Sequence, residues 1–104
     1  MNKAIRNSAI LALAISLAGA MSFAQSGEAT YKAKCAMCHG ATGTPSAGMA
    51  KMLGIKPASD YKNLTAAQIE AVVKNGSANK KMHPITGLSD AQVKAVAAYF
   101  KTLK

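Results

Sequence analysis

The sequence predicts an all-α protein, and three observations support that class. Two segments each begin with a hydroxyl residue followed three positions later by glutamine: Thr65 with Gln68, and Ser89 with Gln92. This spacing is the capping box of a helix N-terminus. Apolar residues then recur at helical spacing after each box. No convincing strand pattern surrounds the two cysteines, so helices are the elements that we expect.

The first residues have the composition of an export signal. Lys3 and Arg6 form a basic start, an apolar run follows from Ala9 to Ala18, and small residues come next. This order is typical of a secretory signal peptide, with cleavage expected after Ala24. The alternative is an uncleaved membrane anchor, but the apolar stretch of about 16 residues is short for a span that needs roughly 20. We therefore expect residues 1–24 to be removed and the protein to reside in the periplasm.

Removal of the signal would leave a single small and basic domain, residues 25–104. Eleven lysines and four acidic side chains give this part a net charge of +7, and it contains no arginine. Nucleic acid is a poor partner for it. The domain lacks arginine side chains, which bind phosphate through two hydrogen bonds, and it lacks sets of aromatic side chains on which bases could stack. Two interpretations of the lysines stay open, namely a solvated surface and electrostatic steering toward an acidic partner. A domain with so small a core is only marginally stable unless a covalent crosslink or a bound cofactor adds to its stability.

The segment Cys35-Ala36-Met37-Cys38-His39 carries the clearest chemical signal. Two cysteines three apart, followed at once by histidine, indicate covalent attachment of haem. On a helix these three residues share one face. The thiols of Cys35 and Cys38 can then add to the vinyl groups of one porphyrin edge, while His39 bonds the iron from the proximal side.

Three other interpretations of the cysteine pair remain. A thioredoxin-like dithiol would need a βαβ context. A zinc site would need about four ligands, and the chain adds only the distant His83. A disulfide that staples a small secreted domain is the third.

The helices are expected in the following order. The first runs from near Gly27 to Cys38, with Ser26 as N-cap. Glycines and prolines punctuate residues 40–57, which predicts a long loop with at most one short helix around Ala47–Leu53. The helix after Thr65 stops at Asn75-Gly76. Its predicted buried residues are Ile69, Val72 and Val73.

The last helix is expected to continue to about Leu103, and Val93, Val96, Ala97 and Phe100 form its apolar face. Between the two capped helices lies an extended loop, residues 76–87, because Pro84 disfavours helix at the residue before it. Met82 in this loop is the candidate sixth ligand of haem iron, since a soft thioether suits iron and raises its potential. His83 is the rival ligand, and an open sixth position is the other alternative.

Taken together, these residues resemble a class I c-type cytochrome of the small, soluble, bacterial periplasmic type with one haem. The residues that carry the resemblance are Gly27, Tyr31, Cys35-Ala36-Met37-Cys38-His39-Gly40, Asn75-Gly76, Met82, Leu88-Ser89-Asp90 and Ala98-Tyr99. The resemblance implies the cytochrome c fold, with about four helices wrapped around one covalently bound haem c. It also implies that the first and last helices cross beside the haem, with Gly27 permitting close approach and Tyr99 as the packing aromatic.

The implied function is one-electron transfer rather than catalysis, by a carrier that is not an integral membrane protein. Its expected partners are acidic redox proteins: a membrane-bound oxidase or reductase, or a periplasmic dehydrogenase. The alternative is a haem-based ligand sensor or peroxidase-like enzyme with an open or displaceable sixth site. A third interpretation, a subunit dedicated to one oxidoreductase, differs in partner and not in chemistry.

Overall fold

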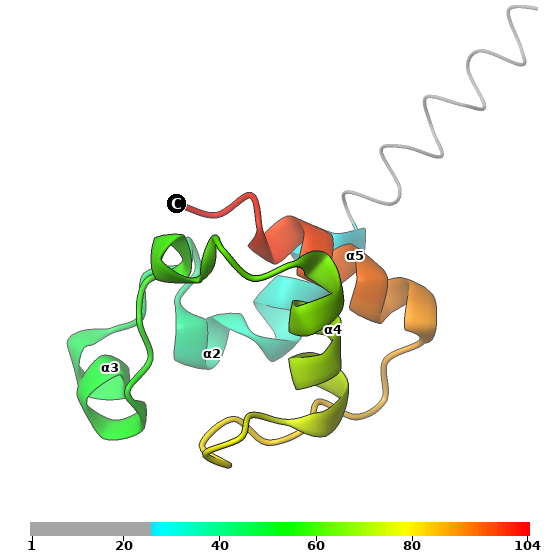
Figure 1. Ribbon diagram of the computed structural model, residues 1–104. Helices are drawn as coiled ribbons and strands as arrows, with labels where there is room; N and C mark the ends of the chain where they lie inside the picture. The colour runs from blue at the N-terminus through cyan, green and yellow to red at the C-terminus, as the bar shows by residue number, and fades with distance from the viewer. Residues whose placement is uncertain (1–25) are drawn as a thin grey trace, which may run out of the picture.

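A computed structural model describes residues 26–104, and the predicted signal peptide lies outside these residues. The described part contains helices and no strand, which confirms the all-α class. An N-terminal helix over residues 26–34 is followed by the elements in Figure 1. These are α2 (Ala36–His39), α3 (Ala47–Leu53), the 3-10 helix η1 (Ala58–Tyr61), α4 (Ala66–Asn75) and α5 (Asp90–Phe100).

The N-terminal helix crosses α5 at Gly27, where the two backbones approach closely (Figure 1). A Cβ atom added to Gly27 would lie 2.5 Å from the carbonyl oxygen of Ala95 and 3.1 Å from the Cβ of Tyr99. Real Cβ atoms do not approach a backbone oxygen so closely, so the crossing requires glycine. The structure thus confirms the close approach expected at Gly27 and the packing of Tyr99 beside it.

The core lies between α4 and α5. Its buried cluster consists of Ile69, Val73, Val93 and Ala97. Both predicted capping boxes are present, because each hydroxyl accepts from the glutamine backbone N–H and each glutamine side chain accepts from the N-cap backbone N–H. Leu64 and Leu88, which precede the two N-caps, pack against the same cluster, so each helix start is also held by a hydrophobic staple.

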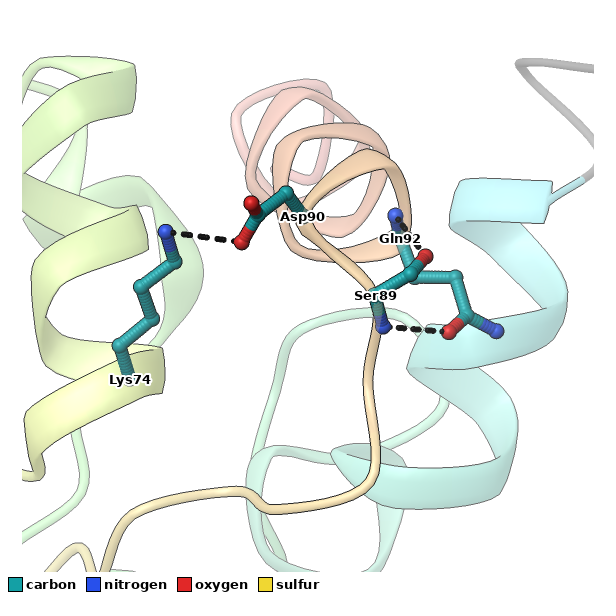
Figure 2. Close-up of polar contacts among 4 residues, drawn as sticks. All are labelled: Lys74, Ser89, Asp90 and Gln92. Atoms are coloured by element: carbon teal, nitrogen blue, oxygen red, sulfur yellow. Dashed lines mark hydrogen bonds and ion pairs between the residues drawn. The ribbon is translucent and has the colours of Figure 1, made fainter.

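Polar contacts also tie α5 to α4. Figure 2 shows the Ser89–Gln92 capping box at the start of α5, with the Lys74 ammonium 3.2 Å from the neighbouring Asp90 carboxylate. Both of these charged side chains are well exposed, so the ion pair adds little to stability. The burial of apolar side chains, rather than this pair, joins the two helices.

The loop after α2 is more ordered than predicted. The short helix expected around Ala47–Leu53 is present as α3, but η1 was not predicted. The backbone N–H of Ala58 donates to the carbonyl of Gly43 at 2.8 Å, and Ala58 is buried. This bond closes the loop at its base, so that a segment rich in glycine and proline becomes a compact unit.

Several predicted boundaries were wrong. The first helix does not continue to Cys38, because Cys35 adopts a turn that separates the N-terminal helix from α2. Ser26 already lies within the helix and is not its N-cap. The last helix ends at Phe100 and continues only as a turn. Val72 is half-buried rather than buried.

Candidate cofactor site

The two cysteines and His39 lie on one tight turn. The backbone N–H of Cys35 donates to Tyr31 at 2.8 Å, which is the last hydrogen bond of the N-terminal helix. The N–H groups of Cys38 and His39 both donate to the carbonyl of Cys35, at 3.2 and 2.9 Å. The backbone relation of i, i+3 and i+4 that haem attachment needs is therefore present, although the helix is broken at Cys35.

Tyr31 and Gly40 hold this turn from its two ends. Tyr31 is fully buried, and its hydroxyl donates to the Gly40 carbonyl at 2.6 Å. Gly40 has φ +84°, and a Cβ atom there would lie 1.9 Å from the carbonyl oxygen of Thr44. Only glycine allows the chain to leave the turn in this direction. Tyr31, nine residues before Gly40, is thus hydrogen-bonded to both ends of the segment that runs from Cys35 to Gly40.

Burial shifts the pKa values of two side chains on this turn. Cys35 and Cys38 are free and half-buried. Burial, and next the neighbouring Cys38, raises the pKa of Cys35 to about 11, so that it is a thiol at neutral pH. Burial also lowers the pKa of His39, which favours the neutral imidazole that binds iron.

An aromatic cluster supports His39 from α5. The His39 and Phe100 rings lie 5.6 Å apart and meet nearly edge-on, at 74°. Phe100 in turn lies near Tyr31 and Tyr61, with centroids 6.3 and 6.1 Å away. The end of the last helix therefore reaches the turn that carries the cysteines.

The predicted ligand loop, residues 76–87, follows α4 and lies at its lower end in Figure 1. Met82 in this loop is half-buried and packs against the α4–α5 core, whereas His83 is exposed. The Lys81 ammonium nitrogen lies 4.0 Å from the position of a Cβ atom added to Gly54, the C-cap of α3. The Lys81 side chain thus reaches the C-terminal end of α3.

The residues present fit a covalently bound haem. Two free thiols and a neutral imidazole lie on one turn, and a thioether is held in a second loop. Among residues 26–104, no group of three or more His, Cys, Asp and Glu side chains is arranged to hold a metal ion directly. Haem attachment does not ask for such a group, since each thiol bonds a different vinyl carbon and only His39 would bond the iron.

The helical fold and this donor set define a c-type cytochrome. A family model described as cytochrome c oxidase, cbb3-type, subunit III matches residues 22–100. The chain belongs to that family, and it is a haem-based electron carrier whose cofactor is haem c. No curated protein and no solved structure matches the chain.

Proposed function

We propose that this protein carries one electron at a time between redox partners in the periplasm, as a small class I cytochrome. In this proposal it holds one haem through thioether bonds to Cys35 and Cys38, with His39 and Met82 as the two axial ligands. The haem supplies a one-electron Fe(III)/Fe(II) couple. The protein supplies attachment, orientation and a filled coordination sphere.

The turn from Cys35 to His39 is the observation that carries this proposal. Its backbone presents two thiols and one imidazole from a single turn, and Tyr31 fixes that turn from the core. Two thioether bonds prevent loss of the haem. The imidazole, kept neutral by burial, provides the proximal ligand without a proton having to leave first.

Met82 is favoured over His83 as the second axial ligand. Its side chain turns toward the interior and packs against the cluster that includes Ile69 and Val73, whereas His83 is exposed. Core packing is also the ordinary use of methionine, so a variant at Met82 is the direct test of this ligand.

The proposed partners are acidic redox proteins. Eleven lysines outweigh four acidic residues in the part of the chain proposed to be exported, residues 25–104. The name of the matching family includes an oxidase, so a membrane-bound oxidase is one such partner, beside a reductase or a periplasmic dehydrogenase. Within residues 26–104, no helix is both long and apolar enough to cross a membrane.

Spectra of the purified protein test attachment and coordination together. Acidified organic solvent is expected to leave the haem on the polypeptide, because thioether bonds survive it. The ferrous protein at neutral pH is expected to resist carbon monoxide, because both axial positions are filled. Full extraction of the haem would refute attachment through the cysteines. Ready binding of carbon monoxide would favour the sensor or peroxidase-like alternative.

The variant Met82→Ala tests the sixth ligand. It is expected to lose the weak far-red band of methionine-ligated ferric haem. Its reduction potential should also fall, because a water or nitrogen ligand favours Fe(III) more than a thioether does. His83→Ala is the matched control on the neighbouring residue and should retain both properties. If His83→Ala changed them and Met82→Ala did not, the ligand would be His83.

A further inference from the structure

The two polar backbone atoms of Met82 are both bound by one residue, Ser77. The N–H of Met82 donates to the Ser77 hydroxyl oxygen at 3.0 Å. The carbonyl of Met82 accepts from the backbone N–H of Ser77 at 2.9 Å. The segment between them is therefore closed into a small ring of hydrogen bonds, with Met82 at one end.

Asn79 adds two hydrogen bonds within the same segment. Its side-chain oxygen accepts from the Ser77 hydroxyl at 2.7 Å and from the backbone N–H of Lys81 at 3.0 Å. Lys80, the residue between Asn79 and Lys81, has a φ of +61°. This is the one positive φ of a non-glycine residue in the described part of the chain. Residues other than glycine rarely adopt this conformation. The bonds of Ser77 and Asn79 hold the loop in it.

The surroundings leave Met82 little room to shift. A Cβ atom at Gly76 would lie 2.8 Å from the Met82 carbonyl oxygen, so the chain entering the loop passes directly against it. Three residues after Met82, the N–H of Ile85 donates to the Val73 carbonyl at 2.8 Å and ties the loop back to α4. The hydrogen-bonded segment from Ser77 to Met82 is thus attached to α4 on both sides.

We propose that Ser77 and Asn79 are positioning residues that keep Met82 on the iron against competing ligands. The proposal rests on the proposed function, since it takes Met82 as an axial ligand. An outside ligand binds only when Met82 moves away, and that movement is opposed by the hydrogen bonds on both sides of its backbone. Neither residue stands out in the sequence. The only signal is a serine and an asparagine, both turn formers, just after Gly76.

Competition by imidazole at the ferric haem tests this role. Ser77→Ala removes the acceptor of the Met82 N–H and the donor to Asn79. The affinity for imidazole, followed by loss of the far-red band, is expected to rise about tenfold. Exchange of the Met82 amide hydrogen should also accelerate. Ser77→Thr keeps the hydroxyl and should restore both values to within about twofold of those of the parent protein.

Ser89→Ala is the matched control. It also removes a serine hydroxyl that accepts a backbone N–H, but at the start of α5. It should lower overall stability while leaving imidazole affinity unchanged. Ser77→Ala binding imidazole no more tightly than Ser89→Ala would overturn the proposal. That result would differ from failure of the proposed function, in which the parent protein itself would lack the band that Met82→Ala removes.

Discussion

At the scale of single residues, Tyr31 links the core to the haem-attachment turn. It is fully buried, its ring lies 5.4 Å from that of Tyr99 at a tilt of 54°, and its hydroxyl donates a hydrogen bond to the Gly40 carbonyl. Its burial makes it part of the core. The structure adds the hydrogen bond, through which the hydroxyl holds the end of the turn that bears His39.

The variant Tyr31→Phe should change how stability depends on alkaline pH. Burial raises the pKa of Tyr31 to about 12 from 10.0. The unfolded chain therefore loses the phenolic proton at a lower pH than the folded protein does. The stabilisation that the buried hydroxyl provides is complete below pH 10 and is lost as pH rises toward 12. Denaturant unfolding of Tyr31→Phe should show a cost of about 1 kcal/mol at pH 7. Between pH 10 and 12 the free energy of unfolding of the parent protein should fall by an amount on the order of 2 kcal/mol, and this fall should be absent in the variant.

The parent protein, measured over the same pH range, provides the comparison. A Tyr31→Phe profile parallel to that of the parent across the alkaline range would contradict the assigned role of the buried hydroxyl.

At the scale of elements, the glycines of two helices have opposite surroundings. Gly27 lies against Ala95 and Tyr99, where the N-terminal helix crosses α5. Gly48 in α3 has open space where a Cβ atom would be added. Sequence alone shows a glycine in a helix at both positions, whereas packing distinguishes a required glycine from a replaceable one.

We therefore expect opposite effects from two identical substitutions. Gly27→Ala should destabilise the protein by about 1–3 kcal/mol, because the methyl group forces the two helices apart. Gly48→Ala should stabilise it by roughly 0.5–1 kcal/mol, since alanine is the better helix former. Thermal unfolding of both variants with haem attached measures this. Equal effects of the two substitutions would refute the close crossing at Gly27.

At the scale of the whole molecule, charge is the property most relevant to partners. Lys80 and Lys81 are exposed and lie immediately before the proposed ligand Met82. Electron transfer requires an approach to the haem edge, and charge near that edge orients the encounter. Electrostatic steering of this kind raises association rates by about 10 to 10³.

The double variant Lys80→Glu with Lys81→Glu should slow bimolecular electron transfer with the physiological partner at low salt. At high salt the difference should shrink, because exposed charges are screened beyond about 8 Å at physiological ionic strength. The reduction potential and the fold should change little. Stopped-flow rates over a salt series provide the measurement.

A charge-matched control must leave the fold intact. Lys101 is unsuitable, because its ammonium group donates to the Leu64 carbonyl at 2.7 Å and joins the end of α5 to the start of α4. The exposed pair Lys94 and Lys104 serves instead. Equal slowing by the two double variants at every salt concentration would mean that the lysines act only as a solvated surface.

The sequence by itself determined the features that depend on neighbours along the chain. The capping boxes at Thr65 and Ser89, the stop at Asn75-Gly76 and the short helix α3 were all predicted correctly. Each follows from hydrogen bonds and backbone preferences that span only a few residues. The spacing of Cys35, Cys38 and His39 likewise pointed to c-type haem, and the family match agrees with that class.

Only the tertiary structure decided the features that join distant segments. The turn at Cys35 forms where the buried Tyr31 reaches over to Gly40, and the 3-10 helix η1 forms where Ala58 folds back on Gly43. The loop that carries Met82 is tied back to α4 by the hydrogen bond from Ile85 to Val73. Local preference is weak at these positions, so contacts between segments outweigh it, and no pattern along the chain records them.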